Sequence, residues 1–276
     1  MEKQNKFVKD MTKGNPMQLL IQFSLPLLVG NIFQQLYNMV DSIIVGNFVG
    51  ANALGAIGTT NSLNFFFFSL VAGLSVGIGI IVAQYFGFGD EEKVKDAIGN
   101  SIWIITICSV IMAIIGFVTA RPILVLLDTD PVILNDAVAY LKVVSIGIVC
   151  VGFYNGVSGI LRALGDSKTP LIFLIVASVL NVILDLIFVL SFGWGVVGAG
   201  VATAFSQLIS ALACIIYAYK SNTYFKLKKK NIKLNGNIIK KSCKLGIPVA
   251  LQNSLIAFSL IVLQKVVNGY GATFTT

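Results

Sequence analysis

The sequence contains seven apolar stretches that are each long enough to cross a lipid bilayer as a helix. They cover roughly residues 17–47, 54–86, 97–120, 133–161, 170–192, 196–219 and 238–268. A spanning helix needs about 20 apolar residues, because each residue adds about 1.5 Å to a path of about 30 Å. With 56% hydrophobic and only 12% charged residues, the chain is too apolar for a soluble domain. The sequence therefore predicts an all-α, polytopic membrane protein.

The lysines predict how these helices are oriented. They precede the first stretch, follow the second and fourth, and are most frequent between the sixth and seventh, whereas the connections at 47–56 and 191–200 carry no charge. The positive-inside rule places the amino terminus and the long basic segment in the cytoplasm. The basic run could also attract nucleic acid or anionic lipid headgroups. We interpret the basic run mainly as a signal for membrane orientation and secondly as a site that attracts lipid headgroups. We expect no nucleic-acid partner.

The basic segment separates two similar pieces of sequence. FSLPLLVGNIF at 23–33 resembles LGIPVALQNSL at 245–255, so that Pro26 aligns with Pro248. Six helices separate the two starts, so both lie on one side of the membrane, as in the parallel repeats of some transporters. We expect a cytoplasmic segment at 1–16, a six-helix amino lobe at 17–220, a basic inter-lobe loop at 221–237 and, at 238–276, the first helix of a carboxy lobe that the chain does not complete.

Two acidic residues, Asp41 and Asp185, lie inside long apolar stretches. A carboxylate deep in a bilayer costs at least about 2.5 kcal/mol on insertion scales, so such residues are functional candidates. Counted from the outer ends of their predicted helices, Asp41, Asp185 and Thr203 lie at a similar depth. Asn181 precedes Asp185 by one helical turn, and Tyr37 precedes Asp41 in the same way. We therefore expect these five side chains to share one layer of the bundle.

The layer offers carboxylate, amide and hydroxyl oxygens, and Tyr140 enters its helix to a similar depth. Such oxygens suit a hard cation such as Na⁺. They equally suit a shared proton, because two carboxylates in one apolar layer cannot both be charged without a cation between them. Alternatively, Asn181, Thr203 or Tyr140 only hydrogen-bond between helices. The sequence thus predicts an ion or proton site without choosing between Na⁺ and H⁺.

Other features predict helix geometry and exclude most enzyme chemistry. Pro26 removes a helix hydrogen bond, so it is a candidate hinge below Asp41, although a static kink is the alternative. Ser69, Gly73 and Gly77 repeat at four-residue spacing and predict a face for close helix contact. Histidine is absent and no nucleophile and base stand together, so we expect neither an enzyme nor a cofactor beyond a coupling ion.

Several stretches resemble the multidrug and toxic compound extrusion (MATE) family, especially its DinF-like branch. They are PMQLLIQFSLPLLVGNIFQQLYNMVDSIIVG, RALGDSKTPL, NVILD and GVVGAGVATAFSQ. In that family, two six-helix lobes form a V-shaped cavity, and drug efflux is coupled to entry of Na⁺ or H⁺. The resemblance implies a cation site at Asp41, Asn181, Asp185, Thr203 and the Ala199 carbonyl. It implies a polar network or substrate cavity at Gln34, Tyr37, Asn38, Tyr140, Asn155 and Gln207.

The resemblance implies a cation-coupled antiporter of the cytoplasmic (inner) membrane that exports amphipathic, often cationic drugs or metabolites. Its partners would be the small-molecule substrate, membrane lipid and the missing carboxy lobe. Residues 238–268 contain no acidic side chain, which disfavours coupling schemes with a carboxylate in the seventh helix. A lipid-linked oligosaccharide flippase is the main alternative, although such proteins tend to have a cationic cavity. A seven-helix receptor fits less well, because its amino terminus should lie outside.

The lysine asymmetry makes a prediction about topology. Single cysteines placed at the amino terminus or at residues 221–236 of a cysteine-free chain should resist an impermeant thiol reagent applied to intact cells. Cysteines at residues 192–196 should react, because that connection is expected outside. Labelling of permeabilised cells provides the control, and reaction of the basic segment in intact cells would contradict this orientation.

Overall fold

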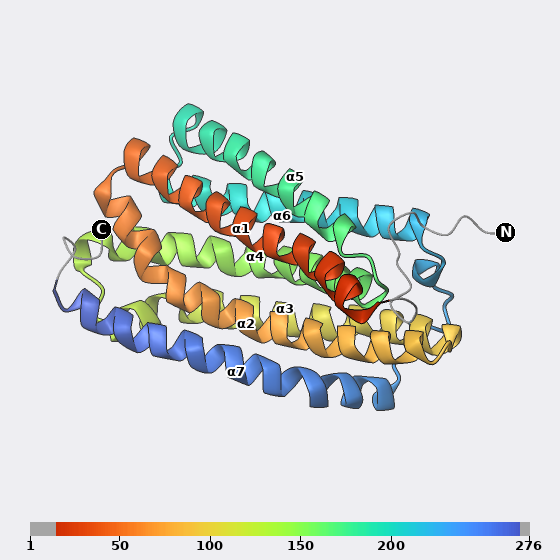
Figure 1. The fold of residues 1–276 in the computed structure, drawn as a ribbon. Coiled ribbons are helices and arrows are strands. Elements are labelled where there is room, and N and C mark those ends of the chain that lie inside the picture. The colour runs from red at the N-terminus through yellow and green to blue at the C-terminus, as the bar shows by residue number, and fades with distance from the viewer. Residues whose placement is uncertain (1–14, 271–276) are drawn as a thin grey trace.

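The computed structural model describes residues 15–270, which form a bundle of long helices that run alternately in opposite directions (Figure 1). The described residues contain no strand, and seven of their helices are long and apolar enough to cross a membrane. The elements in chain order are α1 (Pro16–Phe48), α2 (Ala51–Gly87), α3 (Glu91–Leu126), α4 (Pro131–Ala163), α5 (Lys168–Asp185), the π-helical η1 (Leu186–Ser191), α6 (Gly195–Ser221), the 3₁₀-helical η2 (Thr223–Phe225) and α7 (Gly236–Asn268). The predicted all-α, polytopic fold is confirmed. Of the predicted segment at 1–16, all but the last two residues lie outside the described residues.

Polar caps set where several helices begin. The Asp130 side chain accepts a hydrogen bond from the backbone N–H of Val132, and Pro131 occupies the first position of α4. Asp90 caps α3 in the same way through the N–H of Lys93. As a result α3 begins at Glu91, whereas the apolar stretch alone predicted a start at residue 97. An acidic side chain that caps a helix stabilises its first turn, so the polar residues before the apolar stretch are helical too.

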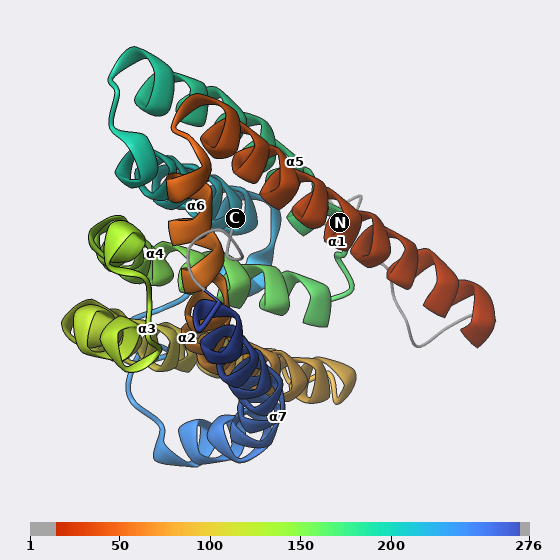
Figure 2. The same cartoon turned by 90° about the vertical axis from the view of Figure 1, so that its left-hand side faces the viewer.

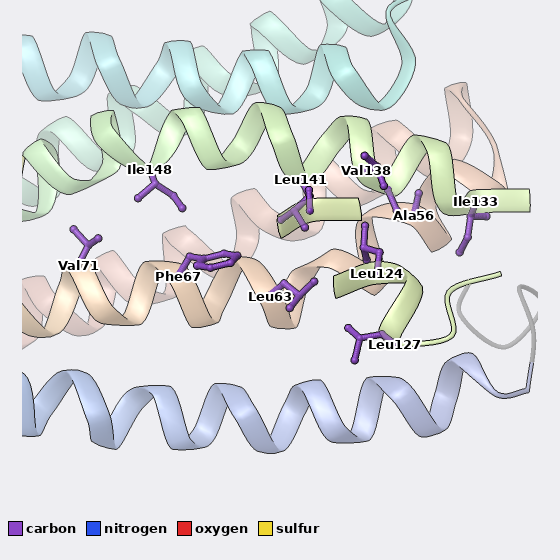
Figure 3. Packing of buried hydrophobic residues seen from close by; sticks show 12 residues of the cluster. Ala56, Leu63, Phe67, Val71, Leu124, Leu127, Ile133, Val138, Leu141 and Ile148 are labelled. Carbon is purple, nitrogen blue, oxygen red and sulfur yellow. The ribbon is translucent and has the colours of Figure 1, made fainter. Parts of the chain in front are cut away.

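One large hydrophobic cluster joins α2, α3 and α4 at the end of the bundle opposite the basic segment (Figure 3). Its side chains interdigitate across the three helices, and ten of them are labelled in the figure: Ala56, Leu63, Phe67, Val71, Leu124, Leu127, Ile133, Val138, Leu141 and Ile148. A second cluster joins α2, α3, α4 and the start of α7 near the basic segment. The outward faces of the helices are also apolar, as expected of surfaces in contact with lipid.

The first and last helices lie at opposite edges of the bundle (Figure 2). α1 packs against α5 at one edge, whereas α7 packs along α2 at the other. The α2–α7 contact is close at the predicted small-residue face. A Cβ added to Gly73 would overlap the backbone of Ala250, and one added to Gly77 would overlap the backbone at Ser242 and Gly246. The prediction of a close helix contact is thus confirmed, with α7 as the partner.

Hydrogen bonds fasten the far end of α7 to the end of α3. Lys265 Nζ donates to the carbonyl of Leu126 at 2.9 Å and lies 3.3 Å from the Asp128 carboxylate. The buried Asn268 side chain donates to the carbonyl of Leu127 at 3.0 Å. Carbonyls in the last turn of a helix have no partner within that helix, so these bonds satisfy groups that the bilayer would leave unpaired.

The close contact predicts unequal costs for two glycine substitutions in α2. Gly77→Ala should destabilise the protein by about 1–3 kcal/mol, because the new Cβ meets backbone that cannot rotate away. Gly87→Ala is the matched control: a Cβ there has no neighbour within 4 Å, and alanine favours the helix. Thermal unfolding of both variants in the same detergent tests this. Equal melting temperatures would contradict the contact.

Candidate functional site

A polar cavity of about 750 Å³ lies between α1, α2, α4 and α6. Seven of its eighteen lining residues carry amide side chains, and the others include two tyrosines, two phenylalanines and one carboxylate. Among the described residues that line it, none is lysine or arginine. The lining residues are Asn31, Gln34, Gln35, Tyr37, Asn38, Asp41, Ser42, Ile57, Asn61, Asn64, Phe65, Phe68, Tyr140, Val144, Ile148, Val151, Thr203 and Gln207.

The two membrane aspartates lie together at the edge of this cavity. Asp41 lines the cavity from α1 and is 7% exposed, while Asp185 at the end of α5 is fully buried behind it. Their carboxyl groups are near enough for a side-chain hydrogen bond once one of them carries a proton. One oxygen of each carboxylate, Oδ1, has no hydrogen-bond partner within the described residues. The pair therefore offers two buried oxygens to a cation or a proton.

Asn181 connects this pair to α6. With its amide nitrogen turned toward Asp185, it donates to Oδ2 at 3.2 Å, and its oxygen accepts from the backbone N–H of Thr203 at 3.3 Å. The Thr203 hydroxyl also lies 3.3 Å from the Asn181 amide. Asn181 is fully buried and stands one helical turn before Asp185, as the spacing requires. The amide thus orients one carboxylate and ties α5 to α6.

Two tyrosines complete the polar layer. The Tyr37 side chain interacts with Thr203 and lies close to both aspartates. Tyr140 is buried and approaches Asp41, Asp185 and Tyr37 from α4. The structure therefore brings together six side chains that depth and helical spacing predict to share one layer, namely Tyr37, Asp41, Tyr140, Asn181, Asp185 and Thr203.

The remaining candidate residues fall into two groups. Gln34, Asn38 and Gln207 line the cavity, as the predicted polar network requires. Asn155 does not: its side chain donates to the Val151 carbonyl of its own helix at 2.8 Å. Ala199 is fully buried and belongs to the hydrophobic cluster that contains Tyr140, outside the cavity lining.

The predicted hinge residue lies within a regular helix. Pro26 falls inside α1, which is helical without interruption from Pro16 to Phe48. Pro248 occupies the corresponding part of α7. Both prolines lie in the first half of their helices, and these two helices run in the same direction (Figure 1). The aligned prolines thus take equivalent places in α1 and α7, as a parallel repeat requires.

Two structural features of the site were not predicted. The first is the contribution of α2, whose Asn61, Asn64, Phe65 and Phe68 line the cavity. Their spacing places them on one face of a helix, together with Ile57, so helical periodicity could have found them. The overlooked signal was the pair of asparagines in this stretch, for which only the small-residue face was considered.

The second unpredicted feature is the π-helical turn η1, which begins directly after Asp185. The Phe192 N–H bonds to the carbonyl of Ile187, five residues back, at 3.1 Å. The rings of Phe188 and Trp194 stack with centroids 5.3 Å apart and cover the turn. Single π turns occur frequently at functional sites, because the extra residue changes the direction of nearby side chains. Apolar composition alone carries no signal for such a turn.

The RALGDSKTPL segment has a structural role in this fold. The buried Asp166 accepts hydrogen bonds from the backbone N–H of Thr169 at 2.9 Å and from its hydroxyl at 2.6 Å. The Tyr154 hydroxyl donates to the Pro170 carbonyl at 2.8 Å. The Asp166 carboxylate satisfies the free N–H of Thr169 at the start of α5, and the bonds together fix the connection between α4 and α5.

The chemistry of the site suits a hard monovalent cation or a proton. Among residues 15–270, no three or more histidine, cysteine or acidic side chains form a group that could hold a metal ion. The donors present are two carboxylates with amide and hydroxyl oxygens, which a small hard cation prefers. The Asn64 and Gln207 side-chain oxygens are also buried without partners in this part of the chain. They add further acceptors for a positively charged or hydrogen-donating group.

Fold and site together define a polytopic helical membrane protein with an acidic cavity. The chain belongs to the MatE family, whose model matches residues 26–187. It is 34% identical over 263 residues to the probable multidrug resistance protein YpnP of Bacillus subtilis and 27% identical to the multidrug export protein MepA of Staphylococcus aureus, with 95% and 94% of this chain covered. A solved structure described as an outward-facing multidrug resistance MATE family transporter superimposes with a TM-score of 0.84 at 28% identity over 91% of this chain.

These relatives are longer than the chain. It covers 58% of the Bacillus protein, 57% of the Staphylococcus protein and 56% of the solved structure. The matches cover 91–95% of this chain. The relatives therefore support the family and the fold of this portion.

The geometry predicts a specific cost for removing the Asn181 amide. Asn181→Leu should destabilise the protein by about 1–3 kcal/mol, because Asp185 Oδ2 and the Thr203 N–H lose a buried partner. Asn155→Leu is the matched control, since the side-chain hydrogen bond of Asn155 within the described residues stays in its own helix. Thermal unfolding in detergent measures both. A loss for Asn155→Leu as large as that for Asn181→Leu would contradict the bridging role.

Proposed function

We propose that this chain forms the amino-terminal part of a cation-coupled antiporter that exports amphipathic, often cationic compounds across the cytoplasmic membrane. The observation that carries the proposal is the buried Asp41–Asp185 pair beside a cavity whose described lining has no basic side chain. The names of the relatives, a multidrug resistance protein and a multidrug export protein, support it. We further propose that the amino terminus and the basic segment face the cytoplasm, in agreement with the lysine distribution.

Exchange follows from the position of Asp41, which belongs to both the cavity and the aspartate pair. A cationic substrate in the cavity is attracted by the Asp41 carboxylate. Na⁺ or H⁺ bound between Asp41 and Asp185 removes that attraction, because it neutralises the same charge. The two cations therefore compete for one site, and binding of either favours release of the other. Aromatic rings at Tyr37, Tyr140, Phe65 and Phe68 give an amphipathic cation its apolar contacts.

The proposal also assigns roles to the remaining residues. Asn181 and Thr203 orient the carboxylates, and Pro26 serves as a hinge that lets the part of α1 carrying Asp41 repack when the charge changes. Gln34, Asn38 and Gln207 contact substrate. The cavity disfavours the flippase alternative, since anionic headgroups would meet Asp41 without a lysine or arginine among the described lining residues.

The decisive test replaces each aspartate in the protein as its gene encodes it. Asp41→Asn and Asp185→Asn should abolish ethidium efflux driven by a Na⁺ or pH gradient in proteoliposomes, because either change removes half of the carboxylate pair. Asp136→Asn, at an exposed position near the start of α4, is the control and should retain efflux. Applying each gradient separately identifies the coupling ion. Efflux at the control rate by both site variants would refute the proposed function.

A further inference from the structure

The basic segment between α6 and α7 is held against α3 by buried polar contacts. Asn231 is 1% exposed, and its side-chain nitrogen donates to Asp96 Oδ1 at 2.7 Å. Its side-chain oxygen accepts from the backbone N–H of Lys228 at 3.0 Å. A Cβ added to Gly99 of α3 would overlap the Asn231 carbonyl, so the segment lies directly on the helix. The residue at position 231 therefore anchors the segment.

Further bonds hold the following residues of the segment. The Asn100 side-chain oxygen accepts from the backbone N–H of Asn235 at 2.8 Å, and its nitrogen donates to the Lys233 carbonyl at 3.3 Å. The Trp103 indole N–H donates to the Ile232 carbonyl at 2.8 Å. An ion pair of 2.8 Å joins Lys230 to Glu92. Residues 230–235 thus have a fixed path along about three turns of α3, from Glu92 to Trp103.

This fixed path presents an unusual mixture of side chains to the surroundings. Ile232 and Leu234 are exposed, at 37% and 64%, and the Trp103 ring beside them is 39% exposed. Lys229 and Lys233 are exposed next to these apolar groups and form no ion pair within residues 15–270. Apolar side chains, an indole and lysines side by side are typical of the boundary between lipid and water.

We propose that this surface, formed by Trp103, Lys229, Ile232, Lys233 and Leu234, binds the headgroups of anionic phospholipids in the surrounding leaflet. Glu92 pairs with Lys230, whereas within residues 15–270 no ion pair joins Lys229 or Lys233 to a carboxylate; the Asp96 carboxylate lines the same hollow as Lys233 and bonds to Asn231. Both lysines are exposed and are therefore available to an anionic headgroup. Ile232 and Leu234 reach toward the acyl region, and the Trp103 ring lies at the interface. The surface is independent of the aspartate pair and of the proposed transport.

The two tryptophans allow a direct test, because Trp103 lies in the first half of α3, toward the basic segment, and Trp194 lies at the opposite end of the bundle, between η1 and α6. In Trp194→Phe, the remaining indole reports lipid next to the proposed surface. The full chain is placed in nanodiscs of phosphatidylcholine with a minor share of phosphatidylglycerol, and bromine is carried by one lipid or the other. We expect Trp103 quenching to show several-fold enrichment of phosphatidylglycerol over its share of the bilayer.

Two variants separate charge from geometry. The double variant Lys229→Gln, Lys233→Gln should lose the enrichment. Each lysine close to an anionic surface is expected to contribute a factor of about five. Asn231→Ala keeps every charge but releases the segment, so it should also reduce the enrichment. In Trp103→Phe, the Trp194 indole is the control and should show no enrichment.

Equal quenching by the two lipids in Trp194→Phe would overturn the proposal. Enrichment that survives loss of both lysines would do the same, since other charges would then be responsible. Circular dichroism and thermal unfolding accompany each variant. The lysine replacements remove no side-chain hydrogen bond or ion pair within the described residues, so they leave the fold intact.

Discussion

The burial of two carboxylates side by side is the constraint on which the rest of the site depends. Asp41 and Asp185 come from different helices, and each has an oxygen without a partner among the described residues. Charges in an apolar interior are tolerated only with a compensating proton, cation or hydrogen bond. Asn181 supplies part of this compensation through its contact with Asp185 and Thr203. In the proposed function a coupling ion supplies the rest, which would link occupancy of the pair to the packing of α1 against α5 and α6.

The surrounding helices keep this pair in place through close packing and polar contacts, because burying apolar surface between helices contributes little free energy in a membrane. Helices in lipid lose little by separating, because the lipid is as apolar as their side chains, and small residues or polar contacts must hold them. α2 and α7 illustrate the first device through Gly73 and Gly77. The ends of α3 illustrate the second: the segment around Asn231 bonds to its start, and Asn268 bonds to its end. α7 is therefore attached to the preceding helices along its whole length.

Much of this arrangement could be predicted from the sequence because the membrane leaves few alternatives. The length of the apolar stretches predicted the seven helices. Depth from the outer helix ends, with helical spacing for Asn181, predicted that Asp41, Asp185, Asn181 and Thr203 lie together. Side-chain direction was harder to predict. Asn155 satisfies itself within its own helix, which its depth could not reveal. The start of α3 was missed because its first turns are polar, so apolar length does not include them. The Asp90 cap makes them helical.

The π turn after Asp185 has a consequence for the length of the fifth membrane helix. A π turn accommodates one residue more than an α turn, so it acts as a single-residue insertion between Asp185 and the stacked Phe188 and Trp194 rings. One residue in an α-helix corresponds to a rotation of about 100°. Deleting one residue from 186–191 would therefore turn the carboxylate away from Asp41 or displace the aromatic end. The position of Asp185 next to Asp41 thus depends on the number of residues in this turn as much as on which residues they are.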